Sequence, residues 1–219
     1  MINFFLQSLS DFKEVRIIYN PQKDFLFSVL SIRENLNYAC QLQRYCGRNI
    51  DILNDNTIND DGDVKLLDAS KYDCHKVEEI IDQLGLTQCA DVRVSNCSGG
   101  QKKRLSIALE LIFSPNVLLL DEPTTGLDSV SSLQLVQLLK TMVKNNPIII
   151  CATIHQPSAK LFSYFDDLYV ISTVGTCIYR GPGNQVLDHF QSFGLNCPVF
   201  HNISDFVLEI ASGLYGEEV

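Results

Sequence analysis

The chain has 219 residues, of which 46% are hydrophobic and 20% are charged, and its formal net charge is −9. This length suits one sizeable folded domain, and the composition excludes an intrinsically disordered chain. The acidic balance offers no overall basic face of the kind that nucleic-acid binding requires, so a nucleic-acid partner is not expected.

Two further classes are excluded by simple patterns. No apolar run approaches the roughly 20 residues of a membrane-spanning helix, and the first residues lack the basic start and full hydrophobic core of a signal peptide.

None of the eight cysteines forms a Cys-x-x-Cys pair, so we expect reduced thiols rather than a zinc site. Cys97 adjoins an expected helix start, which could lower its pKa, but an inert side chain is the more common role.

The first predicted helix starts at a capping box formed by Ser31 and Glu34. Gly47 is expected to end this helix. Residues 48–73 are rich in Asn and Asp and have weak periodicity, so they are predicted to form a surface loop. Their acidic residues do not match the spacing of a calcium-binding loop.

Helices and apolar strands alternate through the rest of the chain. The expected elements, in order, are a helix through Val77, Ile80, Ile81 and Leu84 that ends at Gly85, a strand at Val117–Leu120, a helix capped by Asp128, a strand at 148–154, a hairpin of 168–171 with 176–179 around Gly175, and helices at 185–193 and 204–211. This alternation predicts a parallel sheet covered by helices on both faces. Ligands of such sheets bind at the carboxyl ends of the strands.

Two acids, Asp121 and Glu122, directly follow the predicted strand Val117–Leu120. Adjacent buried carboxylates are costly unless a cation or a proton offsets them, so a Mg²⁺ site is one explanation. A turn with two solvated acids explains this motif, taken alone, about equally well.

A second motif, Ser98-Gly99-Gly100-Gln101, opens an amphipathic helix. Ser98 and Gln101 form a capping box, and the two glycines let a ligand approach the backbone closely. A helix start of this kind attracts anions, phosphates included. Taken alone, an ordinary capped helix explains the motif more often.

Two further residues matter by position. His155 follows the second predicted parallel strand, where a histidine can donate a hydrogen bond to a phosphate oxygen, although a lone histidine is more often structural. Gln22 precedes the Ser31 helix, where its amide could reach a metal ion or water. By itself Gln22 carries almost no weight.

In combination and in this order, these motifs resemble the ABC ATPase set. Ser-Gly-Gly-Gln resembles the signature loop, Leu-Leu-Leu-Asp-Glu-Pro-Thr-Thr-Gly-Leu-Asp resembles Walker B and the D-loop, and Thr-Ile-His-Gln-Pro-Ser resembles the switch histidine segment. Gln22 falls where the Q-loop of this family belongs. The resemblance runs from about Asp11 to the end and is greatest to the G (White/Brown-type) half-transporters, on residues 102–111 and 154–158 and the tail from Tyr179 to Phe206.

The resemblance implies an α/β, P-loop NTPase-like fold, two domains paired head to tail, and ATP with Mg²⁺ as cofactors. The implied roles are Glu122, His155 and Gln22 in catalysis, Asp121 and Gln22 at the metal, and Ser98, Gly99, Gly100, Gln101 and Asp128 in ATP binding or in the loop that links the two sites. The implied partners are a second ATP-binding domain and the transmembrane domain of the same transporter.

The resemblance also implies a division of the chain and a missing part. We expect a helical signature subdomain at about 31–112 and the Walker B, D-loop and switch regions at 113–219, with no transmembrane domain in this chain. None of the twelve glycines is followed by lysine, so the Walker A loop, Gly-x-x-x-x-Gly-Lys-Ser/Thr, and the strand before it are absent from this sequence. We therefore expect one edge of the strand Val117–Leu120 to be unpaired.

Three interpretations of the function remain. The chain is a fragment of a transporter that couples ATP hydrolysis to movement of a lipid, sterol or other hydrophobic molecule, or it is a shortened, non-catalytic subunit that lends its Ser98 loop to a partner's ATP site. A soluble ABC protein of translation or DNA repair is less favoured, because His-Gln-Pro-Ser and the tail resemble the transporters. The parent transporter is expected to be integral to a membrane with this domain at the cytosolic face, and this chain alone is expected in the cytosol.

Overall fold

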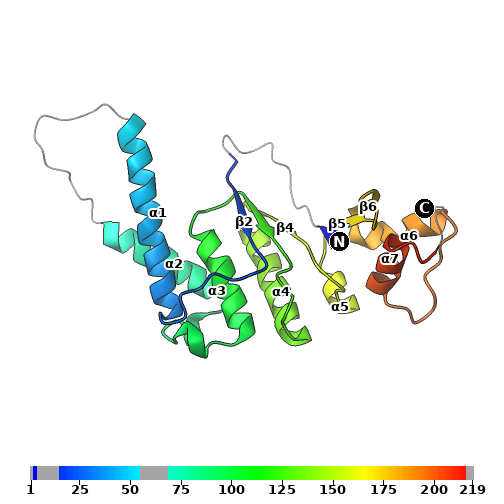
Figure 1. Cartoon of the computed structure of the whole chain (residues 1–219), viewed down its shortest axis with the longest axis horizontal. Coiled ribbons are helices and arrows are strands. Elements are labelled where there is room, and N and C mark those ends of the chain that lie inside the picture. Colours follow the sequence, from blue (N-terminus) through cyan, green and yellow to red (C-terminus); the bar gives the residue numbers. More distant parts are fainter. Residues whose placement is uncertain (1, 4–14, 55–68, 216–219) are drawn as a thin grey trace, which may run out of the picture. The chain divides into compact units, whose positions relative to one another are not determined.

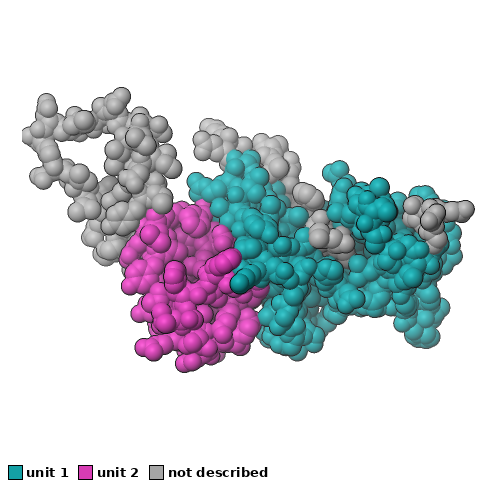
Figure 2. All heavy atoms as spheres, viewed as in Figure 1, with its two compact units in different colours: residues 1–23, 115–219 teal, residues 24–114 magenta. Residues whose placement is uncertain are grey.

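The computed structural model of the chain describes residues 2–3, 15–54 and 69–215. The chain divides into two compact units, shown in Figure 2. Unit 1 consists of Met1–Lys23 and Pro115–Val219, and unit 2 of Asp24–Ser114. The helical subdomain expected at about 31–112 lies inside the bounds of unit 2.

Unit 1 contains a parallel sheet of three strands, in the order β2, β3, β4 (Figure 1). The strands are β2 (Ile17–Asn20), β3 (Val117–Leu120) and β4 (Ile149–Ala152). They are the short, apolar runs that suit a parallel sheet, and Leu118 at the centre is fully buried. The register aligns Asn20, Leu120 and Ala152, so all three strands end at the same level.

The predicted unpaired edge of β3 is wrong. β2 pairs with β3 along one side and β4 pairs with it along the other, each through four residues. The two backbone edges of β3 are therefore both used, and β2 and β4 are the outer strands of this sheet. The expectation failed because it assigned this edge of β3 to the missing strand before the Walker A loop, whereas β2 occupies it.

Helix α4 (Ser129–Asn145) connects β3 to β4. Asp128 caps its start, as predicted, and Asn146 follows its end. Val136 and Leu139 of α4 and Ile150 of β4 line a common small apolar pocket, so the buried side of the helix faces the sheet.

A second, antiparallel sheet of unit 1 has the strand order β1, β5, β6. Its strands are β1 (Ile2–Asn3), β5 (Asp167–Ile171) and β6 (Cys177–Pro182). The predicted hairpin is confirmed, and Gly175 in its turn has a φ of +87°, a value that glycine adopts without strain. The remaining helices of unit 1 are α5 (Ala159–Phe162), the 3₁₀ helix Gly183–Gln185, α6 (Val186–Ser192) and α7 (Ile203–Ala211).

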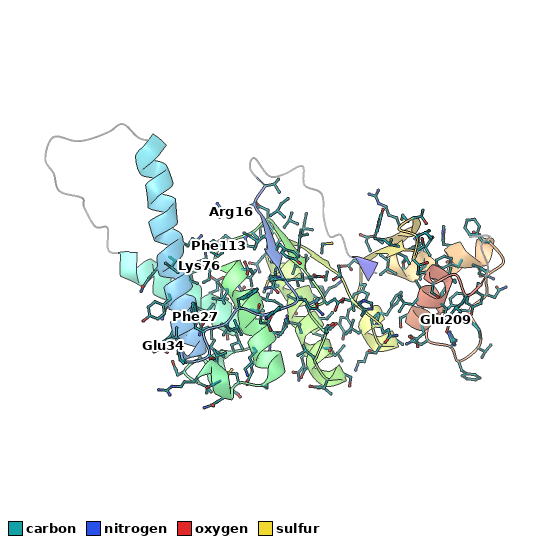
Figure 3. All side chains as sticks on the ribbon, in the orientation of Figure 1. Arg16, Phe27, Glu34, Lys76, Phe113 and Glu209 are labelled. Carbon is teal, nitrogen blue, oxygen red and sulfur yellow. The ribbon has the colours of Figure 1, made fainter. Side chains whose placement is uncertain are left out.

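Unit 2 consists of α1 (Ile32–Asn54), α2 (Ala69–Gln83) and α3 (Gly99–Leu111), with 3₁₀ helices at Thr87–Cys89 and Val94–Asn96. Its core is made of fully or almost fully buried aliphatic side chains, namely Ile32, Leu36, Ile81, Leu84, Leu86, Leu105, Ile107 and Ile112. The predicted capping box of α1 is present: the backbone N–H of Ser31 donates to Glu34, and that of Glu34 donates to the Ser31 hydroxyl. Figure 3 labels Glu34 at this helix start.

The predicted end of the first helix at Gly47 is wrong, because α1 continues to Asn54. A glycine inside a helix costs only about 1 kcal/mol relative to alanine, so the helix can continue through it. Of the loop predicted at 48–73, the two ends belong to α1 and α2, and residues 55–68 lie outside the described residues. Among the helices that the structure describes, none is both long enough and apolar enough to cross a membrane.

Replacement of Leu118 by alanine should destabilise unit 1 strongly. Leu118 is 0% exposed at the centre of the parallel sheet, and truncation of a buried leucine costs about 2–5 kcal/mol. Urea denaturation followed by circular dichroism measures the loss. Val174→Ala is the control, since Val174 is 83% exposed and its truncation should change stability by less than about 0.5 kcal/mol. Equal losses for the two variants would contradict this description of the core.

Candidate functional site

The candidate site lies where the three parallel strands end. The ladder continues past the strands: the N–H of Asp121 donates to the carbonyl of Asn20, and the N–H of Thr153 donates to that of Leu120, both at 3.0 Å. Residues that are far apart in the sequence therefore meet at one edge of the sheet. These are Gln22 after β2, Asp121 and Glu122 after β3, and Thr153 and His155 after β4.

Both carboxylate oxygens of Asp121 accept hydrogen bonds. Oδ1 accepts from the Thr153 hydroxyl at 2.8 Å, and Oδ2 accepts from the Tyr19 hydroxyl at 3.0 Å. The hydrogen bond to Asp121 raises the pKa of Tyr19, with smaller contributions from burial and from the carboxylate charge. Tyr19 therefore keeps its proton and remains a donor to Asp121 at neutral pH.

Glu122 is held by its backbone and by three side chains. Its φ of +44° is in the left-handed region, which a residue with a side chain rarely adopts. Its Oε2 accepts hydrogen bonds from Gln22 Nε2 at 2.7 Å and from the Thr125 hydroxyl at 2.9 Å. His155 Nε2 lies 3.3 Å from Oε1. The Glu122 side chain is 19% exposed and that of His155 is 68% exposed.

Thr153 links the two acids, because its hydroxyl oxygen also accepts a hydrogen bond of 2.9 Å from the backbone N–H of Glu122. The sequence analysis missed Thr153, Tyr19 and Thr125. Thr153 lies two residues before His155, but only the register of β3 and β4 shows that it is beside Asp121.

The Ser98 loop belongs to unit 2. Ser98 caps α3, its hydroxyl accepts from the N–H of Gln101 at 3.3 Å, and Gln101 Oε1 accepts from the N–H of Ser98 at 2.8 Å. The predicted capping box is confirmed. The N–H groups of Gly99 and Gly100, in the first turn, have no acceptor within the helix, as at every helix start. A role of this loop in binding an anion stays a prediction.

A buried ion pair lies one turn further along α3. Lys103 Nζ is 2.7 Å from Asp24 Oδ1, and the Lys103 side chain is only 5% exposed. This pair ties the start of unit 2 to the helix that follows the Ser98 loop.

Cys97, directly before this loop, does not have a lowered pKa. Burial raises the pKa of its thiol, and the neighbouring Cys89 raises it further, against a smaller lowering by Lys102. Cys97 is buried, so the helix start does not activate it. The interpretation of Cys97 as an inert side chain is the better one.

Asp128 acts as the cap of α4. Its Oδ1 accepts from the N–H groups of Val130 and Ser131, both at 2.9 Å, and its Oδ2 accepts from the Ser131 hydroxyl at 2.6 Å. These hydrogen bonds, that of the Ser131 hydroxyl above all, lower the pKa of Asp128. A role for Asp128 in linking two ATP sites stays a prediction.

No cluster of three or more His, Cys, Asp or Glu side chains that could hold a metal occurs among the described residues.

Two family models match the chain. A model described as ABC transporter matches residues 5–125, which is more than half of the chain. A model described as ABC-2 type transporter matches residues 155–219.

The curated relatives agree with these matches. ABC transporter G family member 7 of Arabidopsis thaliana is 35% identical over 93% of this chain and 26% of its own length. ATP-binding cassette sub-family G member 8 of Rattus norvegicus is 34% identical over 87% of this chain and 25% of its own length. The broad substrate specificity ATP-binding cassette transporter ABCG2 of Sus scrofa is 35% identical over 89% of this chain and 27% of its own length. The chain thus spans about a quarter of the length of these relatives.

The cap at Asp128 should make part of the stability of α4 depend on pH. The folded-state pKa of Asp128 lies below the ordinary value of 3.8, so the charged cap stabilises fully above that value, and its contribution is lost as the pH falls through the folded-state pKa. Asp128→Asn keeps a neutral acceptor. It should lower the melting temperature at pH 7, and the difference from the natural chain should shrink as the pH falls below 3.8.

Thermal unfolding at several pH values measures this effect. Ser158→Ala is the control, because it removes the cap of α5 through a hydroxyl that does not titrate in this range. A difference between the natural chain and Asp128→Asn that stays constant from pH 7 to pH 2 would show that the charge of Asp128 contributes nothing to the cap.

Proposed function

Because the chain belongs to the G subfamily of ABC transporters and contains sequence of its ATP-binding domain, we propose that its sheet-edge site hydrolyses ATP to drive transport. The observation that carries the proposal is that Gln22 and His155 both contact the carboxylate of Glu122, while Thr153 links Glu122 to Asp121. These five residues come from the ends of all three parallel strands.

The residues present fit Mg²⁺ and ATP. A carboxylate has about four lone-pair positions, and Asp121 uses one on each oxygen for Thr153 and Tyr19, so one on each remains for a metal. The amide oxygen of Gln22 would be a second oxygen ligand, since its Nε2 is the atom that donates to Glu122. Bound at this site, ATP would supply the bond that is cleaved and Mg²⁺ the positive charge that offsets the phosphate oxygens.

Glu122 is the residue that orients and deprotonates the attacking water. Its Oε2 already accepts two hydrogen bonds, from Gln22 and Thr125. Its Oε1 lies 3.3 Å from His155 Nε2, and in this proposal Oε1 is the oxygen that accepts from the water. The two donors at Oε2 fix the plane of the carboxylate and so the direction of the free lone pair on Oε1.

His155 has a different role. With 68% of its side chain exposed, it can turn from Glu122 toward a phosphate oxygen and donate a hydrogen bond there. Because His155 lies beside Glu122, binding of its ring to the γ-phosphate would change its contact with the Glu122 carboxylate. Gln22 donates to the same carboxylate. In the sequence it lies between the end of β2 and Asp24, the first residue of unit 2.

The second half of each ATP site is expected from another domain. In this proposal Ser98, Gly99 and Gly100 contact the γ-phosphate of an ATP held by a partner ATP-binding domain, Gln101 keeps the loop folded, and Asp128 belongs to the connection between the two sites. A transmembrane domain of the same transporter completes the assembly, and the ATP-binding domains lie at the cytosolic face of the membrane. The cargo is a lipid, sterol or other hydrophobic small molecule.

A second function is favoured by one observation, the capping box that holds the Ser98 loop at the start of α3. The chain can offer this loop to the ATP of a partner domain without hydrolysing ATP at its own site. In that case it serves as a non-catalytic subunit, and the carboxylate site is not used.

The isolated 219-residue chain should bind ATP weakly and hydrolyse it negligibly, since it lacks the backbone cradle and lysine that hold the β- and γ-phosphates in P-loop proteins. Isothermal titration calorimetry with ATP and Mg²⁺ measures the affinity. A dissociation constant in the micromolar range would contradict this expectation.

In the native transporter that contains this chain, Glu122→Gln should lower ATP hydrolysis by at least about 100-fold, because an amide cannot accept the proton of the attacking water. Filter binding should show unchanged retention of ATP. The control is Glu209→Gln, since Glu209 pairs with His201 away from the site. Unchanged hydrolysis in Glu122→Gln would reject the catalytic role and favour the non-catalytic subunit.

A further inference from the structure

The hydroxyl of Thr153 bonds to both acids of the site, and nothing in the resemblance gives it a role. We propose that Thr153 is a positioning residue that holds Asp121 and Glu122 as one unit. The proposal rests on the proposed function, since it concerns the geometry of the same base and metal ligand. Its subject is a side chain that acts through the two acids rather than on ATP.

The direction of the two hydrogen bonds is fixed. A backbone N–H can only donate, so the 2.9 Å contact makes the Thr153 oxygen the acceptor from Glu122. A hydroxyl has one proton, and the 2.8 Å contact directs it to Oδ1 of Asp121. The backbone of one acid and the side chain of the other therefore depend on a single oxygen atom.

The backbone of Glu122 needs such a partner. Its φ of +44° is unfavourable for a residue with a side chain, and conformations of this kind persist only where the surroundings enforce them. The hydrogen bond from the Glu122 N–H to Thr153 is one restraint on this peptide. A second is the 3.1 Å hydrogen bond from the N–H of Thr125 to the Glu122 carbonyl, which closes the turn.

Thr153 is itself well anchored. Its backbone N–H continues the parallel ladder by donating to the Leu120 carbonyl. Threonine is branched at Cβ and its first side-chain torsion is stiff, so the hydroxyl stays where the sheet places it. A displacement of the Thr153 hydroxyl would therefore shift both Asp121 and Glu122.

The remaining contacts of the acids show what Thr153 adds. Tyr19 donates to Oδ2 of Asp121, and Gln22 and Thr125 donate to Oε2 of Glu122. The Thr153 hydroxyl bonds to both acids. Without the Thr153 hydroxyl, the Asp121 carboxylate and the Glu122 peptide would each lose a restraint, although both would remain attached to β3.

The first experiment measures amide exchange of Glu122 in the full 219-residue chain, labelled with nitrogen-15 in glutamate and observed by NMR without nucleotide. Thr153→Val keeps the shape of the side chain and removes the hydroxyl, so the Glu122 amide should exchange about 10-fold faster or more. Thr153→Ser restores the hydroxyl and should return exchange to within about threefold of the natural chain. Thr141→Val is the control, because its hydroxyl bonds only to its own helix.

A merely structural role would give a different result. If Thr153→Val accelerates exchange of the β3 and β4 amides, followed by uniform labelling, as much as that of Glu122, then Thr153 only stabilises the sheet and the proposal is overturned. Unchanged Glu122 exchange in Thr153→Val overturns it as well. Selective acceleration at Glu122 with recovery in Thr153→Ser supports it.

The second experiment measures hydrolysis in the native transporter. Thr153→Val should lower the maximal rate about 10-fold to 100-fold with little change in the KM for ATP, and Thr153→Ser should recover most of the rate. Equal rates in the natural protein and in Thr153→Val overturn the positioning role. The exchange experiment needs no ATP, so it decides the hydrogen-bond geometry even if Glu122→Gln shows that the proposed catalytic function is wrong.

Discussion

The parallel register of β3 with its two neighbours is the constraint on which the site depends. Asn20, Leu120 and Ala152 lie side by side, so the residues that follow them leave the sheet at the same level. Gln22 can then reach Glu122, and Thr153 can reach Asp121, although the first pair is separated by 100 residues and the second by 32. A slip of one residue would turn these side chains to the opposite face.

This constraint also explains which features could be predicted from the sequence. Local signals were sufficient for the caps at Ser31, Ser98 and Asp128, because a cap bonds to residues two or three positions away. They were also sufficient for the hairpin around Gly175. Asp121, Glu122 and His155 were found because they directly follow apolar strands.

Two of the residues that were not predicted, Tyr19 and Thr153, depend on pairing between distant segments. Tyr19 and Thr153 have their roles only because β2 and β4 flank β3, and the strand order was also the point at which the expectation of an unpaired β3 edge failed. The helix end at Gly47 failed for a different reason, since the preference of one glycine is small against the continuation of a helix. Energies of this size do not decide where a helix ends.

The insertion of unit 2 between β2 and β3 has a consequence for how the site forms. The ribosome delivers β2 first, then the whole of unit 2, and only afterwards the acids of β3 and the histidine after β4. The hydrogen bond between Gln22 and Glu122 closes a loop of about 100 residues. Contacts over such separations form slowly, because the chain loses conformational entropy on loop closure before the contacts stabilise it. The edge of β2 that later pairs with β3 therefore stays unpaired until synthesis has passed β3. During this interval the chain is exposed to mispairing at that edge.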